Sequence, residues 1–369
     1  MNPYNGGVPR VSDTLAKYFG DQGHNMFYLT HHRDICDAYH FPAIVFNLPN
    51  PDLFSRENLS YYHKLLKEKS IDLIVNHDAS NDRSRFFLNI GNHPAKKISL
   101  YHTDPLNGLY TTSDFSGKAR KMLSEIFPKV IYTMKIIRKR REIKFLLKNS
   151  DRLILLSEQF KQQISKELKI KSNKIQAISN PLLSYGQFIP ENKKKQILFV
   201  ARMDLLVKRP DKMLMIWSVI QNRHPDWELI FLGDGQDRKK VEDMAVSMKL
   251  LNVRFEGRVD PVPYYKDASI ICMTSDYEGF GLVLLEGMQF GAIPVAFNNW
   301  ISLKDIVIDM VTGIIVPTND IRQYVEKISM LMSDENMRMR FSYNAIDQAK
   351  KFEIEKIGPK WIKLIEEFN

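Results

Sequence analysis

Two glutamates, Glu278 and Glu286, lie on either side of a glycine-rich turn in the second half of the chain. The turn reads Gly279-Phe280-Gly281, and a helical pattern follows it from Leu282. Glycines let backbone N–H groups approach a ligand closely, and the N-terminus of a helix favours an anion such as a phosphate. A carboxylate next to a phosphate is unfavourable unless it accepts hydrogen bonds from hydroxyl groups. The two glutamates therefore indicate a polyhydroxylated ligand, a ribose or a sugar.

Other residues compatible with phosphate follow two more apolar runs in the same half. Arg202, Lys208 and Arg209 come after the run at 197–200, where cations would meet a diphosphate. The turn that begins at Gly233 follows the run at 228–232 and could again bring backbone close to a ligand. Each feature alone is more typical of a surface cation or a structural turn. Together with the turn at 279–281, however, they place phosphate-compatible residues at the carboxyl ends of three strands, which favours a phosphate site.

The elements that must position these residues alternate between short apolar runs and helical patterns, which predicts parallel strands joined by helices. The expected strands are 26–29, 43–46, 71–75, 98–101 and 153–156, then 197–200, 228–232, 253–255, 270–274 and 293–297. The expected helices include 8–19, 58–68, 210–222, 235–250 and 282–290.

The predicted fold is therefore α/β, with two Rossmann-like doubly wound domains that face a cleft. We expect an acceptor-side domain over 1–184 and a nucleotide-sugar-binding domain over 185–351. They join near 180–195, where prolines, a glycine and three lysines interrupt the periodicity. A helix at about 352–369 is expected to pack back on the first domain.

Length and composition agree with two globular domains. The chain has 369 residues, of which 44% are hydrophobic and 26% charged, so disorder is excluded. Two cysteines rule out a disulfide framework or a thiolate metal cluster and fit a reducing compartment. The sequence lacks a signal-peptide pattern and a run of 18 apolar residues, and we expect a cytoplasmic protein.

The net charge of +10 is unevenly distributed. Residues 1–190 hold 28 Lys and Arg against 17 Asp and Glu, whereas the remainder is nearly neutral, with 25 against 26. The densest segment, 134–148, has seven basic residues and one glutamate interleaved with aliphatic residues. It is typical of a helix on an anionic membrane surface, and equally of a helix with an apolar face packed inward. Nucleic acid ranks lower, because no nucleic-acid module is present.

The segments RMDLLVKRPD, ELIFLGDG, VRFEGRV and TSDYEGFGLVLLEGMQFGAIPV together resemble the nucleotide-sugar domain of the retaining GT-B glycosyltransferases of family 4. The resemblance covers nearly the whole chain and is strongest in the second half. It implies transfer of a sugar from a nucleotide diphosphate sugar to a glycan or lipid-linked acceptor, with retention at the anomeric carbon.

The resemblance also implies roles for individual residues. Glu278 would contact the donor sugar, Glu286 the ribose, and Arg202 with Lys208 the diphosphate. The remaining implied donor contacts are the turn Gly279, Phe280, Gly281 and Leu282, the neighbouring Gly233, the Arg258-Val259 stretch beside the base, and Gly6, Gly7 and His102 from the first domain. His102 is equally compatible with a structural histidine at the end of a strand.

No cofactor and no metal are expected, since the chain has no Asp-x-Asp motif and its histidines lack metal-ligand spacing. Surface polysaccharide biosynthesis on the inner face of the membrane is the setting that the basic first domain favours. Two other interpretations stay open. One is an epimerase or phosphorylase on the same fold, and the other is a membrane-surface or polyanion-binding protein with a vestigial nucleotide-sugar site.

Two departures from the family pattern stand out. A strand usually precedes the Gly6-Gly7 loop and lies centrally in the first sheet, yet only five residues precede Gly6. Either the given chain begins after that strand or the first domain lacks it. Past Pro294, the family's small-residue stretch is replaced by 297–305, so the donor's identity cannot be transferred from the resemblance.

Overall fold

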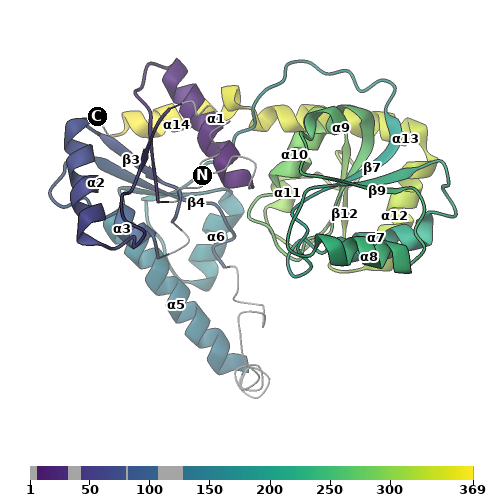
Figure 1. The fold of residues 1–369 in the computed structure, drawn as a ribbon, viewed down its shortest axis with the longest axis horizontal. Coiled ribbons are helices and arrows are strands. Elements are labelled where there is room, and N and C mark those ends of the chain that lie inside the picture. Colours follow the sequence, from purple (N-terminus) through teal and green to yellow (C-terminus); the bar gives the residue numbers. More distant parts are fainter. Residues whose placement is uncertain (1–5, 32–42, 80–81, 107–127, 369) are drawn as a thin grey trace. The chain divides into compact units, whose positions relative to one another are not determined.

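A computed structural model describes residues 6–31, 43–79, 82–106 and 128–368. The chain divides into two compact units. The first unit comprises Met1–Pro181 and Ile357–Asn369, and the second comprises Leu182–Lys356. Figure 1 shows that each unit has a central sheet with helices on both sides. The α/β fold class expected from the sequence is confirmed.

The second unit is built on a sheet of six strands. In sheet order they are β12 (Ile314–Val316), β11 (Ile293–Phe297), β10 (Ala268–Met273), β7 (Lys194–Val200), β8 (Glu228–Leu232) and β9 (Val253–Gly257). Every neighbouring pair is parallel. The chain order reverses direction between β7 and β10, which are adjacent. In open parallel sheets of this kind, ligands bind beyond the carboxyl ends of the strands at that switch point.

Helices cover both faces of this sheet, as Figure 1 shows. On one face lie α7 (Pro210–Ile220), α8 (Arg238–Ser247) and α12 (Ile321–Ser333), and on the other lie α9 (Val262–Asp267), α10 (Leu282–Gln289) and α13 (Glu335–Ala349). A short α11 (Leu303–Ile306) follows β11. Because both faces are covered, all six residues of β10 are buried, and it reads in the sequence as a continuous apolar run.

The first unit contains a parallel sheet of four strands in the order β3 (Leu73–Asn76), β4 (Lys96–Tyr101), β5 (Arg152–Leu155) and β6 (Ile175–Ala177). Two further strands, β1 (Phe27–Thr30) and β2 (Ile44–Asn47), pair in parallel as a separate sheet. The helices are α1 (Gly7–Asp21), α2 (Arg56–Glu68), α3 (Ser84–Phe87), α5 (Pro128–Asn149) and α6 (Glu158–Glu167).

A cavity of about 1470 Å³ lies between these two sheets. Residues of β1 and β3 line it together with the apolar face of α1, which contributes Leu15, Ala16 and Phe19. In the described residues, the first element of the chain is α1, and no strand precedes it. In the second unit, by contrast, the first strand, β7, fills the central place between β8 and β10. Among the described residues of the first unit, β1 and β2 thus form a sheet separate from β3 to β6.

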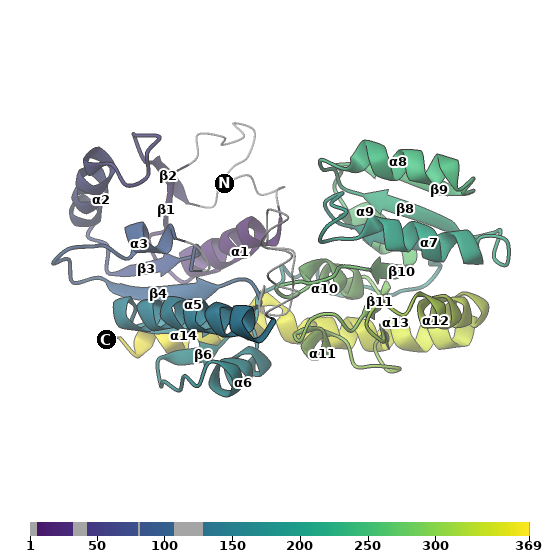
Figure 2. The ribbon, with the colours of Figure 1, turned by 90° about the horizontal axis from the view of Figure 1, so that it is seen from below.

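The chain ends with a 3₁₀ turn (Lys350–Phe352) and α14 (Ile354–Glu366). From Ile357 onward, the terminal helix belongs to the first unit. Trp361 is buried there at a ring distance of 6.4 Å from Phe19, and Glu367 forms a 2.9 Å ion pair with Arg152. Figure 2 shows α14 alongside the sheet that contains β4.

The helix α5 contains the basic segment 134–148 and extends well beyond the sheet (Figure 1). Its C-terminal half packs inward through Ile143 and Leu146, which are fully buried. Toward its start, Val130, Met134 and Ile137 have exposed fractions of 56%, 65% and 42%. The interpretation of a helix that packs its apolar face inward therefore applies to the C-terminal half of α5.

Candidate functional site

The carboxyl ends of β7 and β10 define the candidate site in the second unit. The two strands pair in register through Leu198 and Ile271, so the loops that follow them leave the sheet side by side. The loop after β7 carries Arg202 and Lys208, and the loop after β10 carries Glu278. Residues about 70 positions apart in the sequence are thereby brought to the switch point of the sheet.

Lys208 and Glu278 form a close ion pair there. The Lys208 Nζ lies 2.6 Å from the Glu278 Oε1, and the Ser275 hydroxyl donates to the same oxygen at 2.7 Å. The side chains are largely buried, with exposed fractions of 23% for Lys208 and 11% for Glu278. Such charge-assisted hydrogen bonds hold the carboxylate in one orientation. The expected sugar-binding and diphosphate-binding side chains thus contact each other.

The turn at 279–281 delivers the N-terminus of α10 next to this pair. Gly281 is the N-cap of α10 and has a φ of 94°, a conformation that favours glycine. Because glycine has no side chain, it accepts no hydrogen bond from the N–H groups in the first turn of α10. These N–H groups are therefore suited to donate to an anion. Two contacts hold the turn in place. Phe280 is buried against Phe352, and the Ser302 hydroxyl donates to the Gly279 carbonyl at 3.1 Å.

Glu286 lies one helical turn beyond Leu282, on α10. The hydroxyl of Tyr265, a buried residue of α9, donates to the Glu286 Oε2 at 2.9 Å. A carboxylate can accept several hydrogen bonds, so this contact orients Glu286 and leaves it able to accept from further hydroxyl groups.

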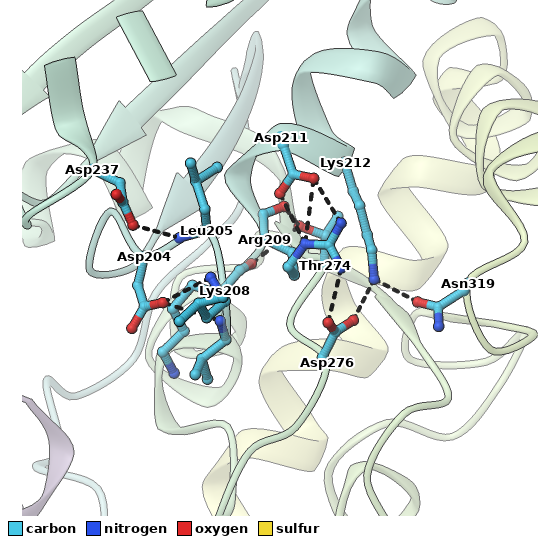
Figure 3. A network of polar contacts seen from close by, with 12 residues as sticks. Asp204, Leu205, Lys208, Arg209, Asp211, Lys212, Asp237, Thr274, Asp276 and Asn319 are labelled. Carbon is cyan, nitrogen blue, oxygen red and sulfur yellow. Dashed lines mark hydrogen bonds and ion pairs between the residues drawn. The ribbon is translucent and has the colours of Figure 1, made fainter. Parts of the chain in front are cut away.

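A second polar network lies beside the Lys208–Glu278 pair and is drawn in Figure 3. The Arg209 guanidinium contacts Asp211 at 2.7 Å and Asp276 at 2.9 Å, and these carboxylates raise the pKa of the arginine. The Lys212 ammonium, which is buried, binds Asp276 and the amide oxygen of Asn319. Arg209 is thus held in ion pairs that tie together the loops after β7 and β10. Its expected place among the diphosphate cations is not supported by this geometry.

Three other predicted residues of the second unit differ in their surroundings. Arg202 has an exposed side chain whose guanidinium contacts Asp204 at 2.8 Å. Gly233 has a φ of 127°, and a Cβ there would lie 2.0 Å from the Ala201 carbonyl oxygen, so close backbone contact with the loop after β7 explains this glycine. The Arg258-Val259 stretch is exposed after β9, next in the sheet to β8.

The segment that replaces the family's small-residue stretch, 297–305, contacts the site loop. The amide of Asn299 donates to the Ser275 carbonyl at 2.9 Å. The indole of Trp300 lies about 3.7 Å from the position of a Cβ on Gly281. The residues at 297–305 that depart from the family pattern therefore include side chains that support the turn.

In the first unit, Gly6 is the N-cap of α1, with a φ of 120°, and Gly7 is its first residue. His102 follows β4 and is buried, with 8% of its surface exposed. Its imidazole stacks on that of His77, with ring centroids 5.1 Å apart, and the His102 Nε2 lies 2.9 Å from the His77 Nδ1. Burial lowers the pKa of His77 to about 4 and is the main cause of a low pKa at His102. Both imidazoles are therefore neutral at neutral pH.

The predicted residues thus form two sets, one in each unit. Glu278, Lys208, the turn at 279–282 and Glu286 surround the switch point of the second unit, whereas Gly6, Gly7 and His102 belong to the first. Two kinds of supporting residue were not among those predicted from the sequence. One is the hydroxyl and amide residues Ser275, Asn299 and Ser302 that hold the turn. The other is His77, which could have been found because it is a polar residue shortly after the apolar run of a predicted strand.

Within the described part of the chain, no three His, Cys, Asp or Glu side chains are grouped so as to hold a metal ion. None of the described helices combines the length and the apolar character that crossing a bilayer requires.

Comparison with known families and structures agrees with this architecture. Residues 186–348 match the model of the glycosyl transferases group 1, and residues 5–182 match that of glycosyltransferase family 4. The solved structure of Anabaena HepE in complex with UDP-glucose superposes with a TM-score of 0.75 at 14% identity, covering 98% of this chain and 96% of HepE. At that identity, the likeness shows the fold alone.

Two curated relatives match at higher identity over shorter segments. An uncharacterized glycosyltransferase of Haemophilus influenzae is 30% identical over 218 residues, which is 57% of this chain and 60% of the relative. An alpha-1,4-N-acetyl-D-galactosaminyltransferase of Campylobacter jejuni is 32% identical over 177 residues, 47% of this chain and 49% of the relative. Its name specifies a glycan linked to PP-undecaprenol. The chain thus spans about half to three fifths of these relatives.

Parallel α/β units of this kind define the GT-B class of fold. The two family models together match nearly the whole chain, and the chain belongs to the group 1, family 4 type of glycosyltransferases. The resemblance stated from the sequence motifs is confirmed.

Proposed function

We propose that this protein transfers a sugar from a nucleotide diphosphate sugar to a hydroxyl group of a glycan or lipid-linked acceptor, with retention at the anomeric carbon. The observation that carries the proposal is the Lys208–Glu278 pair beside the N-terminus of α10 at the switch point of the second unit. The lysine and the backbone N–H groups of α10 match the phosphates of a nucleotide diphosphate sugar. The carboxylate matches the hydroxyl groups of its sugar.

The proposed roles follow from the chemistry of each group. Lys208 and the N–H groups of α10 would stabilise the negative charge that develops on the leaving diphosphate. Arg202, whose side chain is 65% exposed, is able to add a second cation on ligand binding. Glu278 would accept from the sugar hydroxyls and oppose the positive charge on the sugar ring. Glu286, already oriented by Tyr265, would accept from the ribose hydroxyls.

The reaction would break the bond between the anomeric carbon and the diphosphate oxygen and form a bond from that carbon to the acceptor oxygen. The leaving diphosphate would take the acceptor's proton on the same face of the sugar, which accounts for retention. In this scheme the protein contributes position and charge stabilisation, with no metal ion or cofactor.

A donor panel tests the proposal. The purified chain is incubated with UDP-, GDP- and ADP-sugars, and release of the nucleoside diphosphate is measured. Turnover or binding of at least one donor is expected, and its loss in Glu286→Ala would support the ribose role. A chain that neither binds nor turns over any donor would overturn the proposal. A reaction that returns an altered sugar nucleotide would favour an epimerase, and one that consumes inorganic phosphate would favour a phosphorylase.

The acceptor side of the proposal rests on α5. Val130, Met134 and Ile137 form an exposed apolar stripe at helical spacing, and the neighbouring Arg138 and Arg141 are also exposed. An apolar stripe next to cations suits the interface of an anionic membrane. We therefore propose that the protein acts at the inner membrane surface on a lipid-linked or surface glycan.

Flotation with liposomes containing anionic lipid tests this part separately. Met134→Glu is expected to weaken binding, whereas Met215→Glu, at a comparably exposed position on α7, is the matched control. Equal flotation of both variants would contradict the role of α5. Flotation without turnover of any donor would favour a membrane-binding protein with a vestigial site.

A further inference from the structure

Arg209 adopts a backbone conformation that is unusual for an arginine. Its φ and ψ are 54° and 51°, in the left-handed region that favours glycine. It lies between Lys208, which pairs with Glu278, and Pro210, the first residue of α7. A proline disfavours the right-handed helical region for the residue before it, so extended backbone is the ordinary alternative at this position. A left-handed arginine persists only where neighbouring contacts enforce it.

Hydrogen bonds to its own peptide groups are the first of these contacts. The Arg209 N–H donates to the Asp204 carbonyl at 3.0 Å. The Arg209 carbonyl accepts from the Lys212 N–H at 3.1 Å and from the buried Thr274 hydroxyl at 2.7 Å. Asp204 belongs to the loop after β7, whereas Thr274 directly follows β10. The turn at Arg209 is therefore tied to both strands of the switch point, and any residue type at this position could keep these bonds.

The Arg209 guanidinium adds contacts that depend on the arginine itself. Its Nε and Nη2 donate to the two carboxylate oxygens of Asp211 at 3.0 and 2.7 Å, and its Nη1 donates to Asp276 at 2.9 Å. Asp276 is held in turn by the buried Lys212 ammonium, which also binds the amide oxygen of Asn319 at 2.6 Å, as Figure 3 shows. All three nitrogen atoms of the guanidinium thus face carboxylates of the protein, in the paired geometry that makes such contacts strong.

We propose that Arg209 is a positioning residue. Its ion pairs with Asp211 and Asp276 hold its own backbone in the left-handed conformation, and this conformation directs the neighbouring Lys208 toward Glu278 and the diphosphate. Arg209 acts through the backbone and not as a further cation on the ligand. The inference rests on the proposed function for the identity of the ligand. It does not rest on it for the placement of Lys208, which is a property of the protein alone.

Two substitutions, Arg209→Gly and Arg209→Ala, separate the backbone from the charge. Both remove the guanidinium and its ion pairs, but glycine adopts the left-handed conformation freely, whereas the Cβ of alanine disfavours it. The steric penalty of alanine shifts the equilibrium away from the observed turn roughly 5- to 30-fold relative to glycine. Glycine is therefore expected to rescue the placement of Lys208, and alanine is not.

Amine labelling of the full chain measures this placement without any ligand. The side chain of Lys208 is 23% exposed and paired with Glu278, whereas that of Lys239 on α8 is 82% exposed and serves as the internal reference. After brief treatment with an amine-reactive reagent, modification of both lysines is quantified by mass spectrometry. Lys208 should react slowly in the parent and in Arg209→Gly, and roughly 5- to 30-fold faster in Arg209→Ala. Equal rates at Lys208 in the two variants would overturn the proposal.

Melting temperatures report on the backbone of residue 209 itself. Arg209→Gly should melt at least about 2 °C above Arg209→Ala, because residue 209 is left-handed. Arg340 is the matched control, since it is an exposed arginine inside α13. There the order should reverse, because glycine is a poorer helix former than alanine. A protein in which Arg209→Ala melts at or above Arg209→Gly would contradict the proposal.

Titration with UDP, GDP and ADP then connects the turn to the proposed function. For the diphosphate that the parent binds, Arg209→Gly is expected to retain most of the affinity, and Arg209→Ala to bind roughly 5- to 30-fold more weakly than Arg209→Gly. Equally weak binding by both variants would show that the guanidinium itself contacts the ligand, and the positioning role would be refuted. A parent chain that binds no diphosphate, with labelling and melting as expected, would support the positioning role and refute the proposed function.

Discussion

The contact between Lys208 and Glu278 leads to an unusual prediction for Glu278→Gln: the nucleoside diphosphate should bind more tightly while turnover is lost. The Lys208 ammonium is held by the carboxylate at 2.6 Å. A diphosphate that takes up this lysine must compete with Glu278. Glutamine keeps the size of the side chain and a hydrogen-bond acceptor for Ser275 but removes the competing charge.

The size of the effect follows from the distance and the burial. At 2.6 Å and an effective dielectric constant of about 20, the gross attraction is roughly 6 kcal/mol, and most of it is offset by the loss of hydration. The side chains are 23% and 11% exposed, so the net coupling should exceed that of an open surface pair, at about 1–2 kcal/mol. Full release of this coupling would strengthen diphosphate binding roughly 5- to 30-fold.

Calorimetric titration with UDP, GDP and ADP measures the binding, and product release from the matching sugar nucleotide measures the turnover. Asp267→Asn is the control, because it breaks a 2.7 Å ion pair with Lys194 at the amino ends of β7 and β10, away from the site at their carboxyl ends. It should change neither quantity. Weaker diphosphate binding by Glu278→Gln would refute the reasoning, since the carboxylate would then help to hold Lys208 in place for the ligand. A variant with undiminished kcat would refute the role given to Glu278 in the reaction.

Two further outcomes are expected. Gly233→Ala should destabilise the second unit by more than about 3 kcal/mol, because its Cβ would lie 2.0 Å from the Ala201 carbonyl oxygen. The control is Gly20→Ala, in open space within α1, which should be neutral or slightly stabilising. Similar melting temperatures for the two variants would contradict this prediction. The free energy of unfolding should fall as the pH drops from about 6.5 toward 4, because the unfolded chain protonates His77 at its ordinary pKa while the folded chain keeps it neutral. Chemical denaturation at a series of pH values should show a decrease of up to about 3 kcal/mol from this group. The decrease should be absent in His77→Asn.

Much of the fold could be predicted from the sequence because buried parallel strands are continuous apolar runs. The runs at 228–232 and 293–297 coincide with β8 and β11. The missed strands, β6 and β12, have three residues each, too short to show a period. The charge count could not reveal which half of α5 packs inward, because that depends on the neighbours of the helix.

The candidate site was predictable where backbone geometry requires a particular residue type, as at Gly281. It was less predictable for cations. Arg209 and Lys208 are adjacent in the sequence, yet one is held by Asp211 and Asp276 and the other faces Glu278. Two of the partner carboxylates, Asp276 and Glu278, follow a different strand, so the pairing of β7 with β10 is needed to distinguish the two roles. His77 was missed for the same reason, since its partners come from two other elements.

The place of α14 has a consequence for how the protein is made. The first unit includes Ile357–Asn369, and Trp361 is part of its buried core, so the unit lacks a core residue until Trp361 has been synthesised. The second unit is continuous from Leu182 to Lys356 and contains every strand of its sheet. During synthesis, the part of the protein that is encoded later can therefore complete its core first. The first unit completes its core only after Trp361 has left the ribosome.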